Sequence, residues 1–194
     1  MTVCAISDID YAIVSENSRD LSLILSHLQE EWGIYAPASI RDFQNRIYNS
    51  DGHIIAAYQD MEFMGIFEAL RIYTGGDPFR IPDTFASLTG NGTWETHQKR
   101  GDTLVAVDIT VPVEHRRRGI ASRLARYAKA MPGYRFTYSP YSEDFKDARA
   151  LHEKNGARFV RLIENARPSY EGLHVKGTIL DIIPAPGVAV MQYD

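Results

Sequence analysis

The stretch Asp102–Ala121, DTLVAVDITVPVEHRRRGIA, decides the fold class of this chain. Its first part, 103–111, is apolar at nearly every position, which is typical of a strand in the centre of a sheet. Strict alternation would place Val105, Val107, Ile109 and Val111 on one face and Leu104, Ala106, Asp108 and Thr110 on the other. After Pro112 and a short loop, Gly119 leads into a helix. Its predicted inner face comprises Ile120, Leu124, Tyr127, Ala128 and Met131.

The loop between this strand and this helix is the first candidate binding site. At the start of a helix the backbone N–H groups have no intrahelical partners and lie at the positive end of the helix dipole. This arrangement suits a pyrophosphate, and Gly119 would let a ligand approach the backbone closely. Arg116, Arg117 and Arg118 add positive charge. The alternative is a solvated basic turn. The buried strand before the loop and the small residues after it favour the phosphate site.

The rest of the chain is a mixture of helices and strands. A helix with Leu21, Ile24, Leu25 and Leu28 on one face is predicted to begin at a Ser18 cap. Further helices are expected at about 39–48 and 145–155. Strands are expected at 10–15, 53–59, 63–73, 134–139, 157–163 and 173–183. The fold class is therefore α/β (α+β), in one domain over residues 1–194.

Composition excludes several classes of protein. The 194 residues are 44% hydrophobic and carry a net charge of −4, which fits a globular domain and argues against a partner such as DNA. Cys4 is the only cysteine, so neither a disulfide framework nor a cysteine zinc site is expected, and the six histidines lack metal-ligand spacing. No apolar run is long enough for a membrane span, and the N-terminal residues lack a basic signal region. A cytoplasmic, metal-free protein is expected.

Residues 75–101 are the least regular part of the sequence, with several prolines and glycines and one tryptophan, Trp94. A loop of this length in a compact domain is usually functional or mobile. Two interpretations stay open: an excursion over the surface, and a lid over a substrate pocket.

Two motifs resemble those of the GCN5-related N-acetyltransferase (GNAT) superfamily. The acyl-CoA signature Gln/Arg-x-x-Gly-x-Gly/Ala stands here as Arg116–Ala121. The later motif Leu-Tyr-x-x-x-Gly-Phe stands as Leu151–Ala157, with His152 in place of tyrosine. The resemblance covers about residues 53–183. It implies a mixed central sheet with splayed parallel strands and flanking helices, and a CoA-binding core at about 102–163.

The same resemblance implies which residues hold acetyl-CoA or another acyl-CoA. The main chain at 109–113 would run along the pantetheine arm, and the amides at 116–121 would hold the pyrophosphate. The expected CoA-binding residues are Ile109, Thr110, Val111, Arg116, Arg117, Arg118, Gly119, Ile120 and Ala121.

Two side chains are candidates for proton transfer. His152 stands where the family often has the acid that protonates the CoA thiolate. Asp108 lies in a nearly continuous apolar strand, where burial would raise its pKa towards that of a useful base. A hydrogen bond to a neighbouring loop is the other explanation for Asp108. Glu68 is a weaker base candidate, and Tyr138 and Tyr141 are candidates for lining an acceptor pocket.

A narrower resemblance concerns the GNAT-like domains in loading modules of some polyketide synthases. It rests on Asp102–Val105, His152–Ala157 and Val160–Pro168. In those domains a threonine and a histidine form the reactive pair and malonyl-type thioesters are decarboxylated. Thr137 and His152 stand at the matching places.

The leading hypothesis is an acyltransferase that moves an acyl group from CoA to an amine by direct attack. The alternatives are a GNAT-like (methyl)malonyl thioester decarboxylase, or carrier-protein acyl transfer, in natural-product biosynthesis, and a CoA-binding module without chemistry. Small molecules, acyl carrier protein and aminoacyl-tRNA all stay open as acceptors, and the chain is expected to be a monomer or a homodimer.

Overall fold

The computed structural model describes residues 9–33, 36–141, 146–163 and 187–193 and contains a seven-stranded sheet in the order β1-β2-β3-β4-β5-β7-β6. The strands are β1 (Asp10–Ile13), β2 (Ile54–Gln59), β3 (Glu62–Ile72), β4 (Thr103–Thr110), β5 (Tyr134–Tyr141), β6 (Ala157–Ile163) and β7 (Gly187–Tyr193). The helices are α1 (Leu21–Trp32), α2 (Ile40–Ser50), α3 (Phe85–Thr89), α4 (Ile120–Lys129) and α5 (Lys146–Lys154). Short 3₁₀ turns occur at Pro78–Arg80 and Val113–His115.

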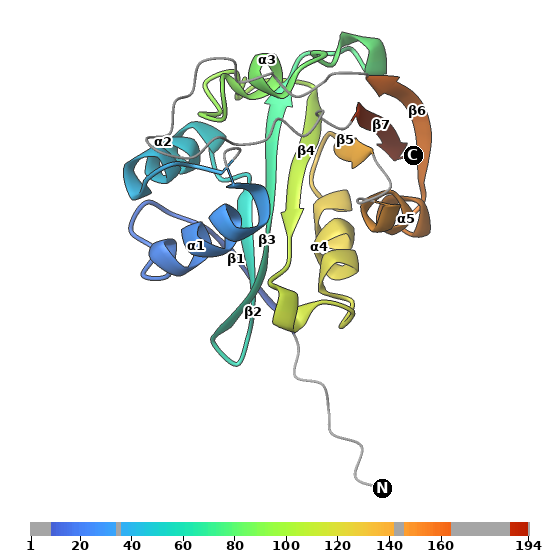
Figure 1. The fold of residues 1–194 in the computed structure, drawn as a ribbon. Coiled ribbons are helices and arrows are strands. Elements are labelled where there is room, and N and C mark those ends of the chain that lie inside the picture. The colour runs from blue at the N-terminus through green and yellow to red at the C-terminus, as the bar shows by residue number, and fades with distance from the viewer. Residues whose placement is uncertain (1–8, 34–35, 142–145, 164–186, 194) are drawn as a thin grey trace, which may run out of the picture.

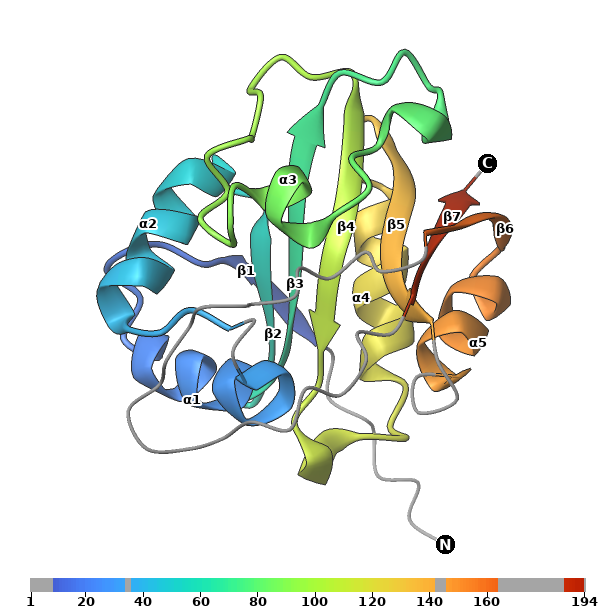
Figure 2. The same ribbon diagram turned by 45° about the horizontal axis from the view of Figure 1, so that its top comes forward.

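Helices cover both faces of the sheet (Figures 1 and 2). On one face α1 and α2 pack on β2 and β3 through a cluster that includes Ile24, Phe43 and Ile66. On the other face α4 packs through Leu124 and its neighbours. The apolar positions predicted for α1 are buried, but the N-cap residue is Asp20 and not Ser18, whose hydroxyl accepts from the amide of Ser15 instead. Ser39 caps α2 by accepting from the amide of Asp42.

The two central strands part from one another. Strands β4 and β5 are parallel and pair at Leu104 with Tyr134, Val105 with Phe136 and Ala106 with Thr137. Beyond Thr137, the pairing partner of β5 is β7, whereas β4 continues along β3. This confirms the predicted mixed sheet with splayed parallel strands.

A β-bulge in β4 reverses the faces of the strand. Glu68 pairs with Asp108 but Ala69 pairs with Ala106, so Val107 has no opposite residue in β3. Before the bulge Ala106 packs on the α4 side, and after it Ile109 and Val111 do so. The strict alternation predicted from the sequence is therefore wrong beyond Val107, because one extra residue exchanges the two faces.

Residues 75–101 pack closely against the sheet. They contain the turn at 78–80 and α3, and Trp94 is 1% exposed, with its Nε1 donating to the carbonyl of Ala69 at 3.0 Å. Leu88 and Ile81 join the same cluster. Trp94, Leu88 and Ile81 thus anchor the segment to the sheet, and both interpretations, the surface excursion and the lid, stay predictions.

Other predictions need correction or lie outside the described part. Tyr127, expected on the inner face of α4, is 38% exposed and stacks on Tyr11. The strand predicted at 173–183 falls outside the described residues, and β7 was not predicted. Among the described helices, none has the length and apolar character needed to cross a membrane.

Candidate active site

A cavity of about 920 Å³ lies where β4 and β5 part. Its walls come from α1, β4, the loop after β4, the start of α4, β5 and α5, so helices on both sides of the sheet contribute. The predicted site residues among the lining are Asp108, Ile109, Val111, Arg116, Arg117, Gly119, Ile120, Ala121, Thr137 and His152. Thr110 and Arg118 are not among them. No residue of 75–101 lines this cavity.

The loop before α4 has the backbone geometry expected of a ligand-binding helix start. Gly119 is left-handed at φ 82°, and a Cβ there would meet nothing within 4 Å. The first turn of α4 carries no acidic residue, so no carboxylate competes for its N–H groups.

The three arginines of this loop have different partners. Nε of Arg116 donates to the carbonyl of Val111 at 3.0 Å, and its guanidinium pairs with Glu31. Arg118 contacts Gln59 and His115 instead of lining the cavity. The loop therefore presents Arg116 and Arg117 to the cavity, and Arg116 also holds the loop against β4 and α1.

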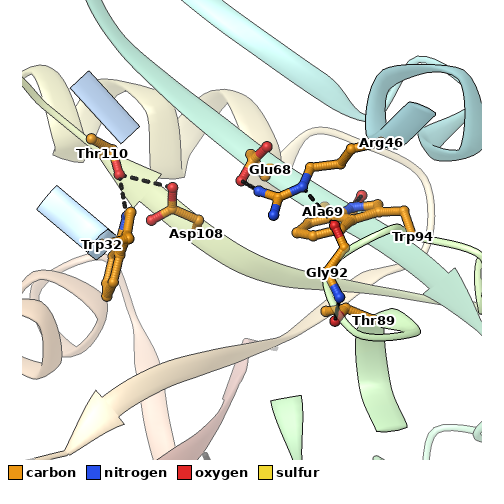
Figure 3. A network of polar contacts seen from close by, with 9 residues as sticks. All are labelled: Trp32, Arg46, Glu68, Ala69, Thr89, Gly92, Trp94, Asp108 and Thr110. Carbon is orange, nitrogen blue, oxygen red and sulfur yellow. Dashed lines mark hydrogen bonds and ion pairs between the residues drawn. The ribbon is translucent and has the colours of Figure 1, made fainter. Parts of the chain in front are cut away.

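A short chain of hydrogen bonds joins α1 to the cavity (Figure 3). Nε1 of Trp32 donates to Oγ1 of Thr110 at 2.7 Å, and Thr110 donates to Oδ2 of Asp108 at 2.8 Å. Thr110 is 2% exposed and its side chain orients Asp108, while its predicted main-chain contact with CoA stays a prediction.

Asp108 lies beside a second buried acid. Desolvation raises the pKa of Asp108 well above its ordinary value, and the charge of Glu68 raises it further. Burial also raises the pKa of Glu68, against the attraction of Arg46, whose Nη1 lies 3.0 Å from Oε2 of Glu68. The structure thus favours an uncharged Asp108 carboxyl, and its hydrogen bond goes to Thr110 within its own strand, not to a neighbouring loop.

Thr137 and His152 meet at the other wall of the cavity. Oγ1 of Thr137 lies 3.4 Å from Nε2 of His152, and both residues are buried. On the far side of the ring, Nδ1 lies 2.7 Å from the hydroxyl of Tyr193 in β7. Burial lowers the pKa of His152 to about 4, so the imidazole is neutral at neutral pH.

Sequence reasoning missed several residues of this site. Trp32, Glu31 and Tyr193 reach it from α1 and β7, which no local motif connects with β4. Arg46 also went unnoticed, although a lone arginine on the apolar side of an amphipathic helix is a signal for a buried acidic partner. The side chains of Tyr138 and Tyr141 lie outside the described part. Within the described residues no cluster of three His, Cys, Asp or Glu side chains suits a metal ion.

Known structures share this fold. The loading GNATL domain of CurA from Lyngbya majuscula is 13% identical over 97% of this chain and 98% of that chain, with a TM-score of 0.70. The GphF GNAT-like decarboxylase in complex with isobutyryl-CoA is 17% identical over 96% and 98%, with a TM-score of 0.66. Diaminobutyrate acetyltransferase EctA from Paenibacillus lautus, in complex with its substrate and coenzyme A, is 15% identical over 96% and 95%, with a TM-score of 0.60.

The chain has the GNAT fold. No protein-family model and no curated protein sequence matches it. The solved GNAT-fold proteins thus include an acetyltransferase, a decarboxylase and a loading domain, all sharing one architecture. Function must therefore be argued from the cavity of this chain.

Proposed function

We propose that the protein binds an acyl-CoA in this cavity and decarboxylates a malonyl-type thioester. The observation that carries the proposal is the contact between Thr137 and a neutral His152 in the cavity wall. Burial and the charge of Glu68 raise the pKa of Asp108, the other ionisable candidate, which favours its uncharged form. Decarboxylation uses neutral hydrogen-bond donors of this kind, whereas attack by an amine needs a base whose pKa lies near the working pH, and a pKa of about 4 makes His152 a weak base.

The CoA would enter along the loop before α4. Its pyrophosphate would accept from the N–H groups at the start of the helix, beside Gly119, with Arg116 and Arg117 adding charge. The thioester end would then lie where β4 and β5 part, between Asp108 on one side and the Thr137–His152 pair on the other.

The reaction needs stabilisation of one charged intermediate. The bond between the α-carbon and the carboxylate breaks, CO₂ leaves, and the electron pair forms an enolate on the thioester. The Thr137 hydroxyl and, in one tautomer, Nε2–H of His152 would stabilise the enolate oxygen. One proton then forms the new C–H bond at the α-carbon. Preorganised donors of this kind typically contribute 10²–10³-fold each.

N-acyl transfer to an amine, the leading hypothesis from the sequence, is the second candidate. The observation that favours it is Asp108 itself, because a carboxylate with a strongly raised pKa is an effective base once it is ionised. Against it stands the low pKa of His152, because at neutral pH the ring is a neutral imidazole and not the imidazolium acid that would protonate a departing thiolate. The acceptor would have to reach the same cavity.

The deciding experiment incubates the protein with malonyl-CoA or methylmalonyl-CoA and follows the CoA products by mass, without an acceptor. We expect catalytic formation of acetyl-CoA or propionyl-CoA. Thr137→Val and His152→Gln should each lower the rate at least ~100-fold while CoA binding persists. His27→Gln, which changes a histidine outside the cavity that stacks on Phe63, is the matched control and should retain the rate.

Intact malonyl-CoA, together with CoA release from acetyl-CoA in the presence of an amine panel, would instead establish N-acyl transfer. Binding of CoA measured by calorimetry, without turnover of either kind, would establish a binding module.

A further inference from the structure

Glu68 lies behind Asp108 and has no place in the chemistry proposed above. It is 1% exposed in the middle of β3, and the register of the sheet sets it directly opposite Asp108 in β4. The bulge at Val107 creates this pairing, because without it Asp108 would point to the α4 face. Directly opposed side chains in neighbouring strands lie about 5 Å apart at Cβ.

Arg46 lies on the other side of Glu68 and opposes the effect of burial on its pKa. Arg46 from α2 is 3% exposed, pairs with Oε2 of Glu68 at 3.0 Å and donates through Nε to the carbonyl of Gly92 at 2.9 Å. Its guanidinium also lies 4.2 Å from the ring centre of Trp94 (Figure 3). An arginine keeps its charge in proteins, so the carboxyl that pairs with it is the one favoured to ionise.

Each of the two acids keeps one buried oxygen without a hydrogen-bond partner among the described residues: Oε1 of Glu68 and Oδ1 of Asp108. Oε2 of Glu68 pairs with Arg46, and Oδ2 of Asp108 accepts a hydrogen bond from Thr110. The further charges that act on Asp108 are Arg46 and, from α1, Glu31. Two carboxyl groups placed so close cannot both ionise readily, and the one without an arginine keeps its proton.

We propose that Glu68 is a positioning residue that, ionised by Arg46, holds a proton on Asp108, and that Asp108 gives this proton to the α-carbon of the enolate. In this step the O–H bond of Asp108 breaks and the C–H bond of the product forms. Asp108 becomes a carboxylate and regains a proton from solvent before the next turnover. The role of Asp108 as donor rests on the proposed decarboxylation, whereas the effect of the Glu68 charge on the protonation of Asp108 does not.

The test measures protonation directly. Protein labelled with carbon-13 at aspartate side-chain carboxyls is titrated by NMR, and Asp108→Asn assigns the signal. We expect Asp108 to be protonated at neutral pH in the wild type. In Glu68→Gln its titration midpoint should fall by at least ~1 pH unit, because the neighbouring negative charge is removed. Glu95→Gln makes the same change at an exposed glutamate and should leave the midpoint unaltered.

An ionised Asp108 at neutral pH in the wild type, or an unaltered midpoint in Glu68→Gln, would overturn the proposal. Should Glu68→Gln fail to fold, the wild-type titration alone decides, supported by an infrared band of a protonated carboxyl that disappears in Asp108→Asn.

Activity separates this inference from the proposed function. With malonyl-CoA the alkaline limb of the pH profile should move to lower pH in Glu68→Gln by the same amount as the NMR midpoint. Absence of decarboxylation together with a protonated Asp108 would remove the donor role and the proposed function but leave the Glu68 effect. Decarboxylation with an ionised Asp108 would remove both the Glu68 role and the donor role of Asp108 but leave the proposed function.

Discussion

The hydroxyl of Tyr193 in β7 lies 2.7 Å from Nδ1 of His152, so this strand fixes the imidazole in the cavity wall. Burial raises the pKa of Tyr193 to about 12, and the phenol therefore keeps its proton. A phenol that donates to Nδ1 leaves the ring proton on Nε2, which faces Thr137. In that tautomer His152 would be the donor that the proposed decarboxylation requires.

The depressed pKa of His152 predicts a pH dependence of stability. A folded pKa of about 4 lies below the ordinary value near 6.5. The contribution of this group is therefore complete above pH ~6.5 and is lost as pH falls towards ~4. Over this window the wild type should lose about 3 kcal/mol more unfolding free energy than His152→Gln.

Urea unfolding of both proteins at several pH values between these limits measures the difference. His97, whose pKa is also lowered to about 4, is present in both proteins and cancels from the comparison. Parallel curves for wild type and variant would show that folding does not lower the pKa of His152.

The loop before α4 predicts a charge-sensitive CoA site. Gly119→Asp should weaken CoA binding at least ~10-fold, because a carboxylate would stand at the helix start where the pyrophosphate accepts its hydrogen bonds. Gly119→Asn is the matched control, since asparagine has the same size, tolerates the left-handed backbone and carries no charge. Calorimetry with CoA measures the affinity of both variants.

Equal affinity of the two Gly119 variants would contradict the placement of the pyrophosphate. Arg118→Ala should change the affinity less than ~3-fold, because that side chain contacts Gln59 outside the cavity and contributes only screened charge.

Asp108→Asn should stabilise the protein at neutral pH, by about 0.5–2 kcal/mol. The folded pKa of Asp108 is raised, so at neutral pH folding must protonate a group that is ionised in the unfolded chain. Asparagine is neutral in both states and still accepts from Thr110. The gain should shrink as pH falls below the ordinary aspartate range, and thermal unfolding at neutral pH and near pH 3 checks it. A destabilised variant at neutral pH would show that Asp108 is charged in the fold.

Tryptophan fluorescence tests the lid hypothesis for residues 75–101. Trp32 lines the cavity, whereas Trp94 is buried under α3. Saturation with acyl-CoA should change the emission of the wild type and leave that of Trp32→Phe, which retains Trp94, unaltered. A ligand-dependent shift in Trp32→Phe would instead support closure of this segment over the site.

The sequence by itself determined the central strand, the loop with its glycine and the helix that follows. It did so because an apolar run, a helix start and a left-handed turn are specified by neighbouring residues. It also indicated the splayed mixed sheet and the Thr137–His152 pair, through motifs that resemble those of GNAT proteins.

Only the tertiary structure decided which groups face the reacting atoms. The bulge at Val107 turns Asp108 towards Glu68, and a bulge depends on pairing with another strand, which alternation along one strand cannot reveal. Trp94 is buried because its side chain packs against an apolar face of the sheet, although the sequence of its segment is typical of a loop. Tyr193 and Arg46 reach the two acid–base centres from distant segments, since side-chain neighbours across a sheet are set by topology and not by distance along the chain.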